Sequence, residues 1–367
     1  MKNFSKLILI LFLFIVLPGH ALAISDPTNA INNKYGIHIN DENDLQDASQ
    51  LVNSRGGDWG YVTFVIREDE MDVVRWSRAF EKMRELHLIP IVRIATSQSD
   101  MGWIQASVSG TSVWADFLDA LPWVTQNRYV IIGNEPNHAT EWGGEVNPEE
   151  YADFLVEQSR ALKLKSSDFY ILPAGLDASA PNDLTHMDEE KFLERMLIHQ
   201  TDLFDYIDGW TSHSYPNPGF SGSVDKTGRG SIKTYAWEID VLKKLGLQKK
   251  LPIFITETGW AHNSESGIGL DEKIVSENLI KAYRDIWIDD NIVAITPFIL
   301  NYPGKPFTQF SWKDTSGKYH QFYFDIKNLN KVQGQPILVD KEITKPHATL
   351  ETVVRSVYNL WHSFWTA

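Results

Sequence analysis

Two apolar stretches of the chain each end in a glutamate, and this pair could carry out acid and base chemistry. Residues 130–133 (VIIG) lead into Asn134 and Glu135, and residues 253–256 (IFIT) lead into Glu257. Short apolar runs are typical of buried strands, so both glutamates are expected where a strand ends. Two carboxyl groups held close together, one protonated and one ionised, can cleave a glycosidic bond. The first motif alone, Asn-Glu-Pro-Asn, would equally well predict a simple turn.

Further polar residues fall in or at the end of other apolar stretches. Arg93 lies within residues 88–95 (LIPIVRIA), and His213 and Tyr215 close residues 206–215 (YIDGWTSHSY). A charge inside an apolar strand is costly unless it is paired, so Arg93 is expected to contact a carboxylate. The alternatives are a purely structural ion pair for Arg93 and a histidine that only satisfies core hydrogen bonds for His213.

These residues need a sheet that gathers the ends of its strands. Strand-like stretches recur roughly every 30 to 40 residues, and segments with helical spacing separate them. Eight strands alternating with helices predict an α/β fold, a (β/α)8 TIM barrel, whose active site lies at the carboxyl ends of the strands. An open doubly wound sheet is the alternative, but no glycine-rich phosphate motif follows the first strand. The predicted strands are residues 34–39, 59–66, 88–95, 130–135, 169–176, 206–215, 251–257 and 292–300.

The segments outside these strands are expected to be mostly helical, with one exception after the eighth strand. There, residues 319–326 (YHQFYFDI) alternate between apolar and polar, which predicts a short strand in an extension of the barrel. A last helix over residues 349–365 is expected to cover the barrel. The other predicted helices include residues 44–53, 112–124, 189–199, 232–245 and 271–289 and one that opens at Pro148.

The first 23 residues have the features of a secretory signal peptide. Lys2 and Lys6 precede the apolar residues 7–17, and residues 21–23 (ALA) supply a small-residue cleavage site. We therefore predict a secreted or periplasmic protein in which residues 24–367 form a single domain. The alternative is a protein anchored by an uncleaved N-terminal segment. Cleavage is expected to leave no stable membrane partner.

Charge and composition restrict the partners of the chain. The formal net charge is −14, and loss of two lysines with the signal segment would make it about −16. This acidic balance argues against nucleic acid and anionic membranes as partners. The chain has no cysteine, which excludes disulfides, thiolate metal sites and cysteine nucleophiles. No cofactor is expected, and the oligomeric state is left open.

The two glutamate motifs together resemble those of the clan A retaining glycoside hydrolases. Residues 134–136 (NEP) match the strand-four signature of that clan, and residues 256–260 (TETGW) match its strand-seven signature. The resemblance covers about residues 35–302. It implies hydrolysis of a β-linked polysaccharide or oligosaccharide by double displacement, with Glu135 as acid/base and Glu257 as nucleophile.

The resemblance also implies roles for other residues. Asn134 would hydrogen-bond the sugar 2-hydroxyl, and Tyr215 would orient the nucleophile with His213 beside it. Arg93 matches the arginine that clan members place near the nucleophile. The sequence departs from the clan at the end of strand eight, where many members carry a tryptophan and this chain reads PFILNY.

Tryptophans in the loops on the reactive face are the expected platforms for sugar rings, because aromatic faces stack on pyranose faces. They are Trp103, Trp142, Trp260 and Trp312, and for each one ordinary loop packing is the alternative. Two other functions remain open: a catalytically inactive carbohydrate-binding protein on the same scaffold, and a metal-dependent hydrolase. The second is disfavoured because His213 is isolated and no His-x-His or His-Glu-x-x-His spacing occurs.

Overall fold

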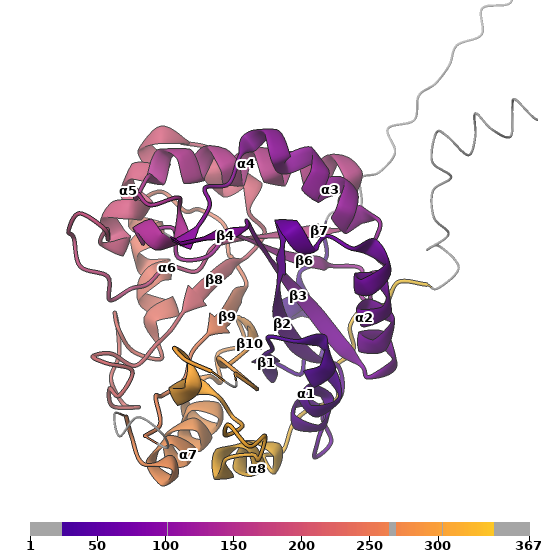
Figure 1. The fold of residues 1–367 in the computed structure, drawn as a ribbon. Coiled ribbons are helices and arrows are strands. Elements are labelled where there is room, and N and C mark those ends of the chain that lie inside the picture. Colours follow the sequence, from indigo (N-terminus) through magenta and orange to yellow (C-terminus); the bar gives the residue numbers. More distant parts are fainter. Residues whose placement is uncertain (1–23, 101, 264–268, 303, 341–367) are drawn as a thin grey trace, which may run out of the picture.

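The chain folds around a ring of eight parallel strands with helices on the outside (Figure 1). This computed structural model describes residues 24–100, 102–263, 269–302 and 304–340. The predicted signal peptide and the predicted helix over residues 349–365 lie outside these residues. The ring strands are β1 (Gly36–His38), β2 (Gly60–Arg67), β3 (Leu88–Ala95), β6 (Arg128–Ile132), β7 (Phe169–Pro173), β8 (Trp210–His213), β9 (Ile253–Glu257) and β10 (Ile292–Ile295).

Continuous ladders join the strands into two groups. The orders are β1-β2-β3-β6-β7 and β10-β9-β8, and all of these neighbours are parallel. Single parallel bridges cross the two seams, from Tyr35 to Ile295 and from Asp177 to His213. The (β/α)8 barrel predicted from the alternating pattern is confirmed, and all eight predicted strands lie within or overlap those observed.

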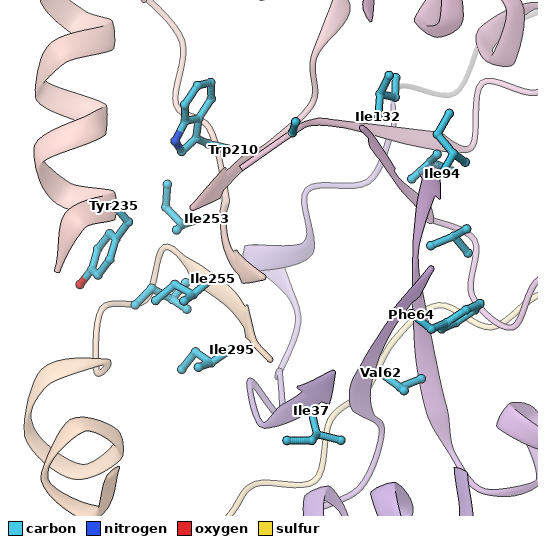
Figure 2. Close-up of a cluster of buried hydrophobic side chains, with 14 of the residues drawn as sticks. Ile37, Val62, Phe64, Ile94, Ile132, Trp210, Tyr235, Ile253, Ile255 and Ile295 are labelled. Atoms are coloured by element: carbon cyan, nitrogen blue, oxygen red, sulfur yellow. The ribbon is translucent and has the colours of Figure 1, made fainter. Parts of the chain in front are cut away.

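Alternate residues of each strand face opposite sides of the barrel wall. On β2, Val62 and Phe64 belong to the large core between strands and helices, while Tyr61 belongs to the core inside the barrel. Figure 2 shows the outer set, including Trp210 and Ile253 near Tyr235 on a surrounding helix. The same alternation turns residues of the upper layer, at the carboxyl ends of the strands, towards the barrel axis.

In the described part of the chain eight α-helices surround the ring, several with caps that their sequences supply. The Asp72 carboxylate accepts hydrogen bonds from the first turn of α2, and the Asn147 side chain caps α4, which opens with a proline. Within the described residues no helix has both the length and the apolar character needed to cross a membrane. The helices are α1 (Leu45–Val52), α2 (Val73–Glu85), α3 (Thr111–Asp119), α4 (Pro148–Lys165), α5 (Glu189–His199), α6 (Thr234–Lys244), α7 (Glu272–Lys281) and α8 (Gln321–Lys327).

The strand predicted over residues 319–326 is wrong, because most of this segment forms α8. Phe322, Tyr323 and Ile326 are buried, and the spacing of one and four residues places them on one helical face. In so short a run the same apolar residues fit a period of two, so the pattern did not distinguish the two structures. The extension beyond β10 therefore contributes a helix and loops. A two-stranded antiparallel piece, β4 (Gln98–Ser99) and β5 (Gly102–Trp103), lies instead in the loop after β3.

Two buried carboxyl groups lie behind β8, between the barrel and the helices. Glu189 opens α5 and Glu238 lies on α6, and neither side chain is exposed. The Trp210 indole donates a 3.0 Å hydrogen bond to Glu238. Burial raises the pKa of Glu238 to about 7, and burial together with the Glu238 charge holds the pKa of Glu189 well above its usual range.

These raised pKa values predict a pH-dependent stability. The folded protein keeps a proton on these carboxyl groups at pH values where the unfolded chain, with a pKa near 4.5, has released it. The stabilisation from this proton binding is therefore fully present below about pH 4.5 and is lost as the pH rises towards 7. Glu238→Gln removes the group that titrates, so the difference in unfolding free energy between the variant and the wild type should depend on pH. We expect this difference to favour the variant by on the order of 2 kcal/mol more at about pH 8 than at about pH 5. Urea denaturation at the two pH values measures this, with Glu190→Gln, an exposed neighbour on α5, as the control. An unchanged difference between the two pH values would contradict it.

Candidate active site

The carboxyl ends of four strands bring the predicted site residues together at one mouth of the barrel. Register alone places two of them side by side, because His213 at the end of β8 pairs with Glu257 at the end of β9. Arg93 comes from β3 and points inward, like Ile89 and Ile91 in the same strand. The sites predicted at separate strand ends therefore form one cluster, as expected for a (β/α)8 barrel.

A sharp bend after β6 delivers Asn134 and Glu135. Gly133 has φ of +88°, and Glu135 has φ of +33°, which is unusual for a residue with a side chain. The Glu135 N–H donates to the carbonyl of Gly175 at 3.0 Å, and this bond holds the bend. A positive φ is unfavourable for a residue with a side chain, and it is found mostly at sites where the direction of that side chain matters.

Glu257 is a buried carboxylate with strong donors on both oxygens. Arg93 Nη1 donates to Oε1 at 2.7 Å, and the Tyr215 hydroxyl donates to Oε2 at 3.1 Å. Burial by itself would raise the pKa of Glu257, but the nearby His213 and Arg93 charges outweigh burial and hold it below its usual value. Glu257 is therefore ionised near neutral pH and is oriented by two donors.

Glu135 is paired with a histidine. The distance between His213 Nδ1 and Glu135 Oε1 is 2.8 Å, so a hydrogen bond joins the two groups. Burial lowers the pKa of His213, but the charges of Glu257 and Glu135 outweigh it, and the net pKa is raised. Gly175 permits this packing, since a Cβ at that position would lie 2.3 Å from the His213 ring.

The carboxyl groups of Glu135 and Glu257 are close. One oxygen of each, and one ring nitrogen of His213, all lie within 4.8 Å of one another. This spacing is shorter than the gap of about 6.5–9.5 Å that admits a water molecule between two catalytic carboxyl groups, and it is near the gap of about 5 Å at which one of them attacks directly.

These three side chains are also spaced as metal ligands would be. In the structure, however, the Arg93 guanidinium donates to Glu257 and the His213 ring pairs with Glu135. The negative charge of Glu257 is thus already balanced by a cation at 2.7 Å, and a second cation would meet its repulsion. The geometry fits a pair of carboxyl groups with separate environments better than a shared metal site.

The prediction of exposed tryptophan platforms is wrong for three residues. Trp142, Trp260 and Trp312 are at most 3% exposed and belong to the main core. The Trp260 indole donates to the Gly222 carbonyl at 2.9 Å, and Trp312 packs edge-on against the ring of a residue in α8, Phe322. The loops that carry them fold back over the barrel, so their rings pack on protein. Of the four, Trp103 is half-buried and lines a narrow cavity with Trp142.

A group of aromatic rings packs against the cluster that contains Tyr215. Phe298 follows β10, is half-buried, and lies edge-on to His38, with ring centres 5.1 Å apart. It packs with Phe310 and Phe307, and Phe307 is 38% exposed. The sequence pattern predicts no role for Phe298, although its position at the end of the predicted eighth strand was the available signal.

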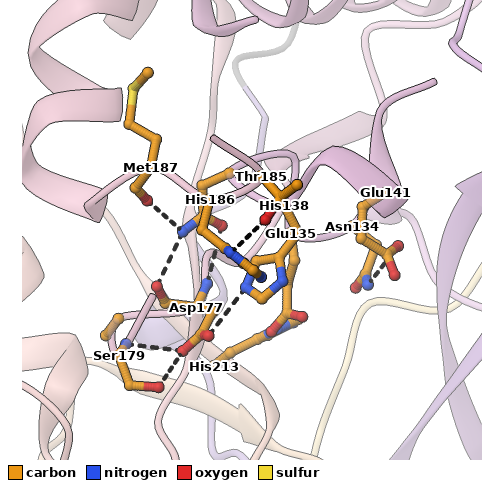
Figure 3. A network of polar contacts seen from close by, with 12 residues as sticks. Asn134, Glu135, His138, Glu141, Asp177, Ser179, Thr185, His186, Met187 and His213 are labelled. Carbon is orange, nitrogen blue, oxygen red and sulfur yellow. Dashed lines mark hydrogen bonds and ion pairs between the residues drawn. The ribbon is translucent and has the colours of Figure 1, made fainter. Parts of the chain in front are cut away.

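A pair of polar residues that the sequence pattern did not predict also lies beside Glu135. His138 Nε2 is 3.0 Å from an Asp177 carboxylate oxygen, and Figure 3 shows this pair next to Glu135 and His213. To the other side, Asn134 Nδ2 donates to Glu141 Oε2 at 3.1 Å. Asp177 and Glu141 both lie in loops after strands, where spacing along the chain does not predict contact.

Comparison with known proteins gives matches among solved structures alone. No protein-family model matches the chain, and no curated protein does. A monomeric β-xylosidase from Caulobacter crescentus CB15 aligns over 85% of this chain and 72% of its own, with a TM-score of 0.53 and 14% identity. A glucosidase from Croceicoccus marinus aligns over 81% and 68%, with a TM-score of 0.57 and 9% identity.

A β-mannanase from Thermomonospora fusca aligns over 82% of this chain and 88% of its own, with a TM-score of 0.50 and 13% identity. At such identities the likeness concerns the fold. The resemblance first seen in two short motifs thus extends to the path of the whole barrel. This chain has the (β/α)8 TIM-barrel fold of clan A glycoside hydrolases.

Proposed function

We propose that this protein is a retaining glycoside hydrolase that cleaves a β-linked polysaccharide or oligosaccharide. The observation that carries the proposal is the pair Glu135 and Glu257, whose carboxylate oxygens lie within 4.8 Å at the barrel mouth. Their surroundings differ in the way that double displacement requires. Glu257 is held by Arg93 and Tyr215, whereas Glu135 is hydrogen-bonded to His213.

The first step uses both carboxyl groups. Glu257 attacks the anomeric carbon while Glu135 gives its proton to the leaving oxygen, so the carbon–oxygen bond of the substrate breaks as a glycosyl–Glu257 ester forms. The Arg93 and Tyr215 hydrogen bonds fix the attacking oxygens in direction. In the second step Glu135 removes a proton from water, and the water releases the sugar from Glu257.

His213 has a role in keeping a proton at the acid. Its ring is buried, and its pKa is raised because Glu257 and Glu135 outweigh the effect of burial. The ring nitrogen at 2.8 Å can therefore hold a proton next to Glu135. The proton that Glu135 takes from water in the second step restores the acid for the next leaving group, and the His213 ring holds that carboxyl group in place.

The surroundings of the carboxyl pair suit a sugar. Phe298, which packs on the cluster that contains Tyr215, and Phe307 beside it offer ring surface, and Asn134 lies at the position from which the resemblance places an amide against the 2-hydroxyl. Pyranose faces are apolar and their rims carry hydroxyls, so aromatic rings combined with carboxylates and amides bind them well. From the signal peptide predicted over residues 1–23, we propose that the substrate is an extracellular or periplasmic glycan.

The experiment that tests this function is a screen of purified protein for reducing sugar. The panel comprises β-glucans, mannans, galactans, xylans and bacterial exopolysaccharides, each with and without EDTA. We expect hydrolysis of at least one β-linked polymer that is unaffected by EDTA. Binding without hydrolysis would favour an inactive carbohydrate-binding protein, and loss of activity in EDTA would favour a metal-dependent hydrolase.

The pKa shifts predict a bell-shaped pH dependence of kcat/KM. Glu257 must be ionised, and since its pKa lies below its usual value of 4.5, the acid limb should fall below that pH. The alkaline limb reports loss of the proton from His213, whose raised pKa places this limb above pH 6.5. Initial rates at low substrate concentration from about pH 3 to pH 10 measure both limbs. A flat profile would contradict the assignment.

A further inference from the structure

A third carboxyl group faces the candidate active site and has no part in the mechanism above. Glu141 closes a short 3-10 helix, Ala139–Glu141, in the loop after β6. Its side chain lines the narrow cavity that Arg93, Asn134, Trp103 and Trp142 also line. A carboxyl group in so apolar a cavity is costly unless it serves a neighbour, and the neighbour that it contacts is Asn134.

The Asn134 amide is held at both ends. Arg93 Nη1 donates to Oδ1 at 2.6 Å, and Nδ2 donates to Glu141 Oε2 at 3.1 Å. If the amide were rotated by half a turn, its NH2 group would face the guanidinium and its oxygen would face the carboxylate. Both contacts would be repulsive, so the two charged partners select one orientation.

This orientation leaves donor capacity on Asn134. An amide nitrogen carries two hydrogens, and the bond to Glu141 uses one of them. The direction of the second is fixed by the planarity of the amide once the first is bound. A fixed donor costs less conformational entropy when it binds a hydroxyl than a freely rotating one does.

We propose that Glu141 is a positioning residue, which fixes the Asn134 amide so that it presents its second N–H to the 2-hydroxyl of the bound sugar. This inference rests on the proposed glycosidase function. Glu141 itself does not touch the reacting atoms. It acts through Asn134, and Arg93 links the same amide to the nucleophile, since one Arg93 nitrogen donates both to Asn134 and to Glu257.

Ionisation of Glu141 makes the positioning of the Asn134 amide depend on pH. Burial raises the pKa of Glu141 to about 7, and the charge of Glu135 adds to this effect, while the Asn134 hydrogen bond and Arg93 oppose it. The groups facing it are Arg93 on β3, Glu135 in its own loop and Glu257 on β9, with His138 nearby. The ionised carboxylate is the stronger acceptor, so Asn134 is held more firmly above about pH 7 than below it.

The kinetic test uses 2,4-dinitrophenyl β-D-glucoside and its 2-deoxy analogue. We expect Glu141→Ala to lower kcat/KM on the glucoside by roughly 10- to 100-fold and on the 2-deoxy compound by less than about 3-fold. In an Asn134→Ala background the change at position 141 should have no further effect. Glu141→Gln, which keeps an acceptor, should recover part of the loss, and Glu145→Ala, an exposed residue in the same loop, is the control.

Equal losses on the two substrates, or losses that multiply in the double variant, would overturn the role of Glu141 and leave the glycosidase function intact. A second arm does not depend on activity. In protein labelled with ¹⁵N-asparagine, the side-chain NH2 signals assigned by Asn134→Ala should shift as the pH passes through about 7, and this shift should vanish in Glu141→Gln. Signals that do not titrate in the wild type contradict the inference, even if a substrate for the protein is never found.

Discussion

Replacement of Glu257 by glycine is expected to lower hydrolysis of activated aryl glycosides by roughly 10⁴-fold or more, because no group remains to form the glycosyl ester. The structure also predicts how the variant can be rescued. Arg93 and Tyr215 would still present their donors to the space that the carboxylate leaves. A small anion such as azide or formate fits those donors and can attack the same face of the sugar.

Azide attack in the Glu257→Gly variant inverts the anomeric centre once, so the expected product is the α-glycosyl azide. Proton NMR of the product mixture reads this configuration directly. A matched control is Glu277→Gly, which removes an exposed glutamate on α7 and should leave the rate unchanged. Circular dichroism confirms that the Glu257 variant is folded. If it retains more than about one hundredth of wild-type activity without azide, Glu257 is not the nucleophile.

The barrel could be predicted from the sequence because its signal is regular. Strands buried on both faces read as continuous apolar runs, and residues 88–95 coincide with β3. The positions of Glu135 and Glu257 were predictable for a related reason: the polar residue that ends an apolar run comes where the strand ends, at the mouth of the barrel. Glu135 and Glu257 are both in that position.

Loop residues carried no comparable signal. The burial of Trp142, Trp260 and Trp312 depends on how loops from different strands fold against each other, and such long-range packing leaves no period in the sequence. Glu141 was missed for the same reason. It lies six residues beyond Glu135, and only the bend at positions with positive φ returns the loop to Asn134.

Local pattern also failed where two periods coincide. In α8 the apolar residues Phe322 and Ile326 are separated by four positions, which is compatible with one face of a strand and with one face of a helix. Packing on the barrel decides between them, because a helix buries both side chains against the core without leaving an unpaired strand edge.

The role of Glu135 is separated from that of Glu257 by a second substitution, Glu135→Ala. Loss of the acid should lower kcat/KM by roughly 10²- to 10⁴-fold on substrates whose leaving group needs protonation. Substrates with a good leaving group, such as 2,4-dinitrophenyl glycosides, should still react with Glu257. The glycosyl–enzyme should then accumulate, because no carboxylate remains to activate water, and mass spectrometry of the intact protein should detect the added sugar.

Azide should now accelerate the second step of the Glu135→Ala variant, since an anion needs no general base. It attacks the glycosyl–Glu257 ester from the opposite face, so the configuration is inverted a second time and the product is the β-glycosyl azide. The two variants therefore give azides of opposite configuration from one substrate. An α-azide from Glu135→Ala together with a β-azide from Glu257→Gly would show that the roles are exchanged.

Because His213 pairs with Glu135 at 2.8 Å, the Glu135→Ala variant should also lose the alkaline limb of the pH profile. Persistence of that limb would assign it to another group.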